Sequence, residues 1–355
     1  MDEEAEGNMI RVTLHQHRFA NDVEGATVIF IHMHFIFSKY VSWFVLLLGM
    51  AVVHAVHAAS TGRPLLQADP TVFFFEGTYY LYGTDKAGQG FEVYTSKDLQ
   101  RWAGPQGKRD GFALRKGESF GQRGFWAPQV FYHRGKFYMA YTADEQIALA
   151  TSDSPLGPFT QNTPRKISGD TRQIDPFVFF DDDGKIYLYH VRLDEGNKLY
   201  VAEMRSDLSD IKPKTLRPCL KLDQQWEDTG RARWPVMEGP TVIKHGKHYY
   251  LFYSANDFRS PDYAVGYAVA PTALGPWKKP SRQPLLSRHV IDASGPGHGD
   301  LFKDAQGAWR YVFHVHASPV VAQPRRTAMV TIRFVRDSGR EAPQLVENSL
   351  VYLAR

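Results

Sequence analysis

Three acidic residues stand in similar local contexts along the chain. Asp69 and Asp175 each precede a proline, Glu238 lies two residues before Pro240, and an apolar run of strand type follows each of them. Two carboxyl groups can divide the work of hydrolysis, because one protonates a leaving oxygen while the other activates water or attacks directly. A third carboxyl group beside the acid raises the pKa of that acid and keeps it protonated near neutral pH. Hydrolysis of a glycosidic bond is therefore the chemistry these residues would perform if the fold brought them together.

The elements that must position these carboxyl groups come from one repeated pattern. Each copy has an apolar strand-type run, a polar turn centred on a glycine, and a second run rich in aromatic residues, which together predict a β-hairpin. The five copies begin at Ala68, Trp126, Ile174, Glu238 and His298.

Further strand candidates separate the hairpins, at residues 91–95, 147–151, 199–204 and 264–269. A hairpin, a third strand and an outer strand make the four-stranded blade of a propeller. No amphipathic helical stretch interrupts the array, so a TIM barrel, which needs a helix after each strand, is not expected. The sequence predicts an all-β protein built as a five-bladed β-propeller.

Alignment of the five copies on their apolar residues places Asp69, Ala127, Asp175, Gly239 and His298 at one equivalent position, just before the innermost strand. In a propeller these positions surround one end of the central channel, and Glu238 lies one residue earlier. A single Asp-Pro pair could simply open a strand, since Asp favours turns and Pro suits a strand start. Three carboxyl groups from separate copies are better explained by a common pocket.

The motifs Ala68-Asp69-Pro70, Ile174-Asp175-Pro176 and Met237-Glu238-Gly239-Pro240 resemble those of glycoside hydrolase family 43, in order and at blade spacing. Trp126-Ala127-Pro128 and Gly297-His298-Gly299 resemble its second-blade and fifth-blade motifs. The resemblance spans nearly all of residues 66–336 and implies a five-bladed propeller with an inverting site. It further implies that Asp69 is the general base, Glu238 the general acid, and Asp175 the group that tunes and positions the acid.

The same resemblance suggests three substrate-binding residues. Arg326 is similar to the family's arginine that binds the terminal sugar, although the neighbouring Arg325 is an alternative. Trp126 could be an apolar platform for a sugar ring or a packing residue, and His298 could bind the substrate or pack in the core. No cofactor is required; in some relatives a calcium ion lies near the histidine that corresponds to His298, and here any metal stays unassigned.

Composition limits the other function classes. Lys and Arg number 42 against 38 Asp and Glu, giving a net charge of +4, and no long basic run appears, so nucleic acid is not an expected partner. The one cysteine, Cys219, rules out an intramolecular disulfide framework.

The amino terminus predicts export. Residues 33–58 have the layout of a signal peptide, with a basic residue, a short apolar stretch and a small-residue cleavage site after Ala58. Residues 1–32 are interpreted as a misassigned or disordered extension, and residues 59–355 as a single catalytic domain. The apolar stretch is shorter than a spanning helix needs, so a secreted or periplasmic protein without a stable membrane anchor is expected.

The sequence thus favours an inverting glycoside hydrolase that releases terminal pentoses from plant-type polysaccharide or oligosaccharide, as an α-L-arabinofuranosidase or a β-xylosidase. Three alternatives remain open: an endo-arabinanase, an exo-galactanase, and a sugar-binding propeller without catalysis. The last would be expected to lack one of the three carboxyl groups, and all three are present.

Overall fold

The computed structural model describes residues 62–337 and 340–355, which lie within one compact unit, Ser60–Arg355. The predictions of an extension at residues 1–32 and a signal peptide at residues 33–58 lie outside the described residues. Within the part that is described, no helix is long and apolar enough to cross a membrane.

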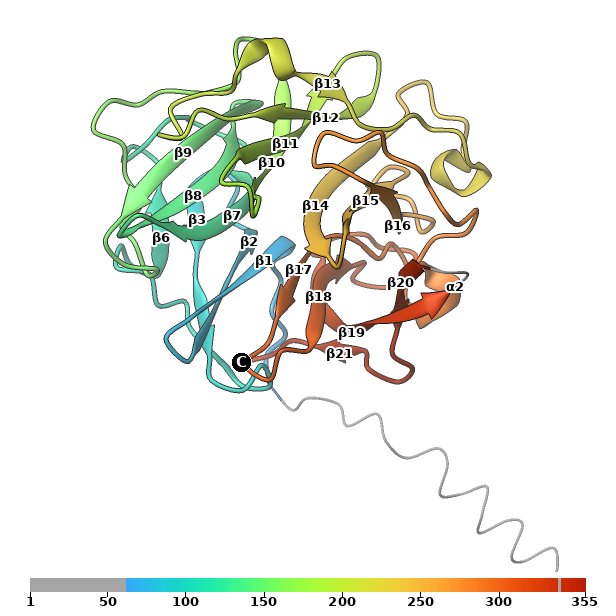
Figure 1. Ribbon diagram of the computed structural model, residues 1–355. Helices are drawn as coiled ribbons and strands as arrows, with labels where there is room; N and C mark the ends of the chain where they lie inside the picture. The colour runs from blue at the N-terminus through green and yellow to red at the C-terminus, as the bar shows by residue number, and fades with distance from the viewer. Residues whose placement is uncertain (1–61, 338–339) are drawn as a thin grey trace, which may run out of the picture. The chain divides into compact units, whose positions relative to one another are not determined.

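Five antiparallel sheets follow one another around a central axis, and the five-bladed propeller predicted from the sequence is confirmed (Figure 1). The innermost strands are β1 (Ala68–Phe75), β7 (Trp126–His133), β10 (Gln173–Phe180), β14 (Met237–His245) and β17 (Gly297–Lys303). Their hairpin partners are β2 (Thr78–Thr84), β8 (Lys136–Ala143), β11 (Ile186–Leu193), β15 (His248–Ala255) and β18 (Trp309–Val315). These pairs number the blades 1 to 5 in chain order.

Third strands complete the blades outward. They are β4 (Tyr94–Ser96), β9 (Gln146–Ser152), β12 (Asn197–Glu203), β16 (Ala264–Ala270) and β19 (Arg326–Asp337). Outermost strands are β5 (Trp102–Ala103), β13 (Arg217–Pro218) and β20 (Arg340–Leu345), and isolated bridges Thr151–Thr160 and Val269–Lys278 take this place in blades 2 and 4. The predicted strand at residues 91–95 is divided: β3 (Gly90–Glu92) leaves the blade and pairs with β6 (Phe112–Arg115), while β4 stays in the blade.

Helical structure is confined to short connections in the described residues. These are η1 (Pro213–Thr215), η2 (Gln225–Asp228) and α2 (Arg288–Ile291).

The hairpins need residues with a positive φ at their turns, and glycine supplies this at Gly77 with a φ of 71°.

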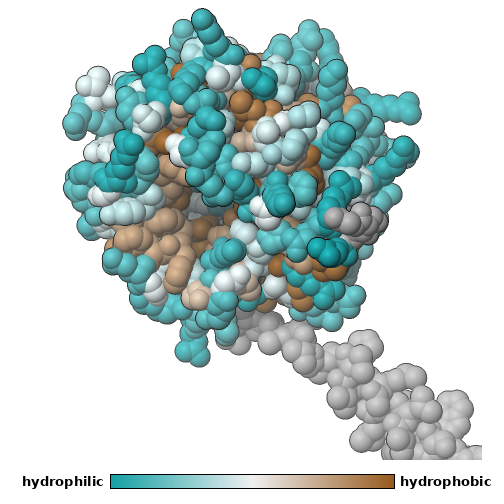
Figure 2. Space-filling model, viewed as in Figure 1, coloured by the Kyte–Doolittle hydropathy of each residue, from teal (hydrophilic) through white to brown (hydrophobic). Residues whose placement is uncertain are grey.

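The hydrophobic core lies between the blades. Five clusters of buried side chains each combine residues of two neighbouring blades, as Met139 and Tyr82 do between blades 1 and 2, and Val312 and Leu81 do between blades 5 and 1. Both faces of each sheet are therefore covered, which explains the continuous apolar runs in the strands. The face seen in Figure 2 is mostly hydrophilic, with apolar residues gathered in smaller patches.

The circle closes in blade 5. The backbone of Arg63 exchanges hydrogen bonds of 2.8 and 2.9 Å with Arg355, and the amide of Leu65 donates to the carbonyl of Leu353 at 2.9 Å. Strand β21 (Val351–Tyr352) also pairs with β19. The segment that leads into β1 is thus fixed to the last blade, which sets the position of Asp69 relative to residues of blade 5.

Candidate active site

Each innermost strand begins with a β-bulge, and the bulge sets the direction of one side chain. The register shifts directly after Ala68, Trp126, Ile174, Glu238 and Gly297. The next residue has a left-handed backbone in every blade: Asp69 (φ 48°), Ala127 (46°), Asp175 (56°), Gly239 (60°) and His298 (43°). Bulges commonly re-aim side chains beside functional sites. The equivalence of these five positions, inferred from the sequence, is visible in the backbone itself.

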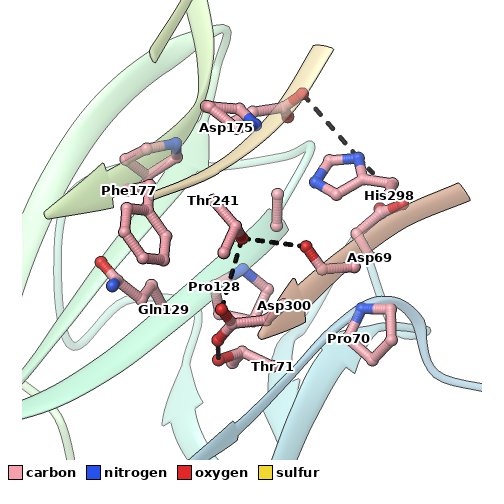
Figure 3. A pocket seen from close by; sticks show the side chains of 14 residues that line it. Asp69, Pro70, Thr71, Pro128, Gln129, Asp175, Phe177, Thr241, His298 and Asp300 are labelled. Carbon is pink, nitrogen blue, oxygen red and sulfur yellow. Dashed lines mark hydrogen bonds and ion pairs between the residues drawn. The ribbon is translucent and has the colours of Figure 1, made fainter. Parts of the chain in front are cut away.

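These bulges surround a pocket at the end of the central channel (Figure 3). The bulge residues Asp69, Asp175 and His298 line it, together with side chains two residues further along, such as Thr71, Gln129 and Asp300. Asp300 accepts a hydrogen bond from Thr71, at 2.5 Å, and another from Thr241, at 3.3 Å. The pocket therefore draws on every blade.

Hydrogen bonds between neighbouring blades hold the bulges in place. The amide of each bulge residue donates to a side chain: Ala127 to Thr84, Asp175 to Thr142, Gly239 to Asp175, His298 to Ser254, and Asp69 to His314. Four of these acceptors stand at the same position of a second strand in the preceding blade. In blade 3 this position is the apolar Val191, whose side chain cannot accept a hydrogen bond. The amide of Gly239 donates instead to Oδ2 of Asp175, at 3.3 Å. Asp175 is thereby tied to the residue that follows Glu238.

Asp69 is surrounded by cationic and polar partners. Nη1 of Arg325 lies 2.9 Å from Oδ1 of Asp69, and Nδ1 atoms of both His298 and His314 lie 3.4 Å from the same oxygen. Burial alone would raise the pKa of Asp69, but the positive charge of Arg325 is the main opposing influence, and the pKa lies below its ordinary value. Burial lowers the pKa values of His298 and His314 themselves. Asp69 is thus ionised and able to accept a proton.

Glu238 has the opposite environment. Burial is the main reason why its pKa is raised, and the negative charge of Asp69 adds to the effect. The hydroxyl of Tyr263 donates to Oε1 of Glu238 at 2.9 Å, and Nδ2 of Asn197 donates to Oε2 at 2.8 Å. These two hydrogen bonds oppose the rise in pKa, and they fix the orientation of the carboxyl group.

Asp175 is buried with its pKa raised well above the ordinary value, first by burial and then by the charges of Glu238 and Asp69. Asp175 and Glu238 therefore titrate as an interacting pair, and together they retain a proton that Asp69 does not. Oδ2 of Asp175 lies 3.8 Å from Nδ1 of His298, the same nitrogen that faces Asp69. One ionised and one proton-bearing carboxyl site in a common pocket can provide a base and an acid for hydrolysis.

The structure brings most of the sequence-predicted residues together, but not all. Asp69, Asp175 and His298 line the pocket and contact one another through His298. Glu238 directly precedes Gly239 of the same bulge and interacts electrostatically with both aspartates. Trp126 is half-buried at the bulge of blade 2, at the position that Glu238 occupies in blade 4, and its ring packs against Gly124.

The arginine at the pocket differs from the one that the sequence favoured. The guanidinium of Arg326 lies 4.1 Å from the ring centre of Tyr352, on the opposite side of the strand. Arg325, the alternative, reaches Asp69 and packs over the ring of Phe258. Because successive residues of a strand point to opposite faces, only one of the pair can face the pocket, and the geometry brings Arg325 to it.

Sequence reasoning missed four residues that contact the carboxyl groups: His314, Thr84, Tyr263 and Asn197. His314 and Thr84 had a signal, since Thr84, Thr142, Ser254 and His314 stand at one position of the aligned repeats. Tyr263 and Asn197 lie in or next to third strands, where no repeated motif marks them.

No group of three or more His, Cys, Asp or Glu residues within 62–337 and 340–355 has the arrangement of a metal site. His298 contacts two carboxyl groups, and the idea of a calcium ion near it stays a prediction.

Taken together, the propeller and this pocket define the architecture of a propeller-type glycosidase. The sequence profile of glycosyl hydrolases family 43 matches residues 63–338. The chain therefore belongs to glycosyl hydrolases family 43, as the sequence motifs had indicated.

Solved structures agree in fold. The crystal structure of an endo-1,4-β-xylanase from Bacteroides thetaiotaomicron VPI-5482 is 40% identical, with a TM-score of 0.75, over 82% of this chain and 98% of that chain. A thermostable family-43 glycoside hydrolase is 36% identical, with a TM-score of 0.70, over 80% of this chain and 93% of the other.

Related sequences include an extracellular exo-α-(1→5)-L-arabinofuranosidase of Cellvibrio japonicus, 27% identical over 52% of this chain and 58% of the relative. A putative β-xylosidase of Xylanibacter ruminicola is 24% identical over 72% of this chain and 46% of the relative. The chain thus spans about half the length of these two relatives.

Proposed function

We propose that the protein is an inverting glycoside hydrolase that releases a terminal arabinofuranose or xylose from plant-type polysaccharide or oligosaccharide. The observation that carries the proposal is the division of charge at the site: the pKa of Asp69 is held low against burial by Arg325, 2.9 Å away, whereas that of Glu238 is raised by burial. Such a division supports water activation by Asp69 and a proton held by the interacting pair of Glu238 and Asp175. In this proposal Glu238 is the member of the pair that protonates the leaving oxygen. Asp175, bound to the amide of Gly239, positions the acid and shares its titration.

Arg325 replaces Arg326 in this proposal as the arginine beside the terminal sugar. Its planar donor group suits two adjacent hydroxyls, and its contact with Asp69 supports a role beside the proposed base.

Two measurements test the proposal. Purified protein is assayed on a panel of nitrophenyl glycosides, and the anomeric configuration of the first-formed product is followed by proton NMR. Activity on arabinofuranosides or xylosides with inversion is expected, because Asp69 has to leave room for a water molecule. Product of retained configuration would contradict the role of Asp69, and binding of sugars without turnover would favour a non-catalytic propeller.

An endo-acting enzyme on a xylan backbone is a second candidate, favoured by the likeness to the solved endo-1,4-β-xylanase. Product lengths separate the two modes: terminal release gives monosaccharide from the first minutes, whereas internal cleavage gives a ladder of oligosaccharides.

We further propose that the protein is exported and that the mature chain starts near Ala59, in line with its extracellular relative from Cellvibrio japonicus. Amino-terminal sequencing of protein recovered outside the cytoplasm tests this, and an intact segment of residues 1–32 on that protein would contradict it.

A further inference from the structure

Trp234 is an exposed tryptophan that is nevertheless held in one orientation. It lies in the loop between η2 and β14, and 45% of its surface is accessible. Its indole Nε1 donates a hydrogen bond of 2.9 Å to Oδ1 of Asn197. The polar atom of the indole is therefore satisfied inside the protein, while much of the apolar ring stays open to solvent.

Asn197 connects this ring to Glu238. Its Nδ2 donates to Oε2 of Glu238 at 2.8 Å, while its Oδ1 accepts from Trp234. The two partners fix the orientation of the amide, since a carboxylate oxygen needs a donor and an indole N–H needs an acceptor. A single buried amide group thus separates the indole from the carboxyl group of Glu238.

The surrounding backbone is fixed as well. The amide of Asn197 donates to the carbonyl of Pro235 at 2.9 Å. Gly196 allows this close approach, because a Cβ atom there would lie 2.7 Å from the same carbonyl oxygen. Earlier in the loop, the amide of Ala232 donates to Oδ1 of Asp228 at 2.8 Å. The ring of Trp234 is therefore prepared before any ligand arrives, which reduces the entropic cost of binding.

We propose that Trp234 is the platform for the leaving-group sugar, a pyranose ring of the polysaccharide that lies beyond the bond to be cleaved. This inference rests on the proposed function, in which Glu238 protonates the glycosidic oxygen. The sugar that departs with that oxygen has to lie beside Glu238, where the fixed indole offers an apolar face to its C–H groups. Contact at this place gives the protein a preference for leaving groups that are sugars.

Substrates with and without a leaving-group ring test the platform. The Trp234→Ala variant is assayed on a disaccharide and on the glycosyl fluoride of the same terminal sugar, whose small leaving group cannot reach the loop. We expect roughly a tenfold greater loss of kcat/KM on the disaccharide than on the fluoride, the size of one aromatic contact. Trp234→Phe keeps a ring but loses the hydrogen bond to Asn197, and it should recover most of the disaccharide activity.

Tyr132→Ala is the matched control, because Tyr132 is 46% exposed and lies in strand β7 outside the pocket lining. This variant should match the parent on both substrates. Equal losses of Trp234→Ala on both substrates, with no recovery in Trp234→Phe, would mean that Trp234 acts only by holding Asn197 and Glu238, and would overturn the platform.

A binding measurement separates failure of this inference from failure of the proposed function. Xylo- and arabino-oligosaccharides are titrated into the Asp69→Asn variant, with and without Trp234→Phe, and tryptophan fluorescence is recorded. A change in emission that requires Trp234 supports the platform even if the parent protein hydrolyses no pentoside, which would contradict the proposed function alone. Emission changes of equal size in both variants would place the bound sugar away from Trp234 and overturn the inference.

Discussion

At the scale of single residues, the pocket assigns different protonation states to chemically similar groups. Asp69 and Glu238 are both buried carboxyl groups, so burial raises the pKa of each. The difference lies in their neighbours, because Asp69 has Arg325 at 2.9 Å, whereas Glu238 has only the neutral donors Tyr263 and Asn197. The cation therefore stabilises the ionised form of Asp69, as its proposed role of base requires.

This assignment predicts different leaving-group dependence in two amide variants. Glu238→Gln should lose roughly 10²–10⁴-fold in kcat/KM on glycosides with a sugar leaving group, as for removal of a general acid. It should lose much less on aryl glycosides, because a phenolate departs without protonation. Asp69→Asn should be severely impaired on both, since each substrate needs activated water.

Steady-state kinetics on matched aryl and sugar glycosides check the prediction. Equal damage in Glu238→Gln on both substrates, combined with leaving-group dependence in Asp175→Asn, would require the roles of Glu238 and Asp175 to be exchanged.

The hydrogen bond from Tyr263 to Glu238 predicts how the pH dependence of activity changes when the hydroxyl is removed. Its hydroxyl stabilises the ionised form of Glu238 and lowers the pKa of that group, so Tyr263→Phe should raise this pKa. In the proposed mechanism activity requires protonated Glu238, so the basic limb of the kcat/KM profile should move to higher pH, by about one pH unit for a hydrogen bond to a charged group.

Tyr253→Phe is the control for this shift. Tyr253 is also a buried tyrosine that donates to a glutamate, but its partner is Glu227 of η2, which is paired with Lys279. The variant should keep the parent pH profile, and a shift of the Tyr263→Phe profile to lower pH would contradict the assigned effect of its hydroxyl.

At the scale of strands, the bulges explain why sequence repeats located the site. Residues at one aligned position share one backbone conformation, so Asp69, Asp175 and His298 necessarily point to the same place. That part of the site could be predicted, because it follows from local repetition. Arg325 could not be distinguished from Arg326 in this way, because the choice depends on the register of β19 against β18. Asn197 and Tyr263 reach Glu238 through tertiary packing alone, which no repeat encodes.

The hydrogen bonds between blades predict a cost for removing one acceptor. Thr142→Val keeps the shape of a fully buried side chain but leaves the amide of Asp175 without its partner. The expected decrease in the free energy of unfolding is about 1–3 kcal/mol, and kcat/KM should fall because Asp175 is no longer fixed.

Ser152→Ala provides the comparison. It removes a buried hydroxyl that accepts a hydrogen bond from the amide of Ser154, at the end of β9. This variant should have a lower free energy of unfolding but an unchanged kcat/KM of the folded protein. Chemical denaturation and kinetics on both variants distinguish the two effects, and unchanged activity in Thr142→Val would show that Asp175 needs no such support.

At the scale of the whole propeller, the two ends of the ring of blades are joined by hydrogen bonds and by packing. The segment around Leu65 bonds to Leu353 and to Thr327 of β19, and the side chains of Leu65 and Leu353 both pack in the cluster between blades 5 and 1. This junction also carries function, since Asp69 of blade 1 contacts Arg325, which directly precedes β19 of blade 5. The ion pair between Asp69 and Arg325 therefore joins the first blade to the last.

Closure predicts that a substitution far along the chain from Asp69 weakens the whole molecule. Leu353 is 2% exposed, and Leu353→Ala should lower the free energy of unfolding by roughly 2–5 kcal/mol, as for a large-to-small change in a core. Val351→Ala, at a 44% exposed residue of the adjacent strand β21, should change it by less than about 0.5 kcal/mol. Urea denaturation followed by tryptophan fluorescence and by circular dichroism measures both variants. A single transition shifted to lower urea is expected for Leu353→Ala, because the blades share their core clusters; loss of blade 1 in a separate early transition would mean that the junction closes the ring without coupling the blades.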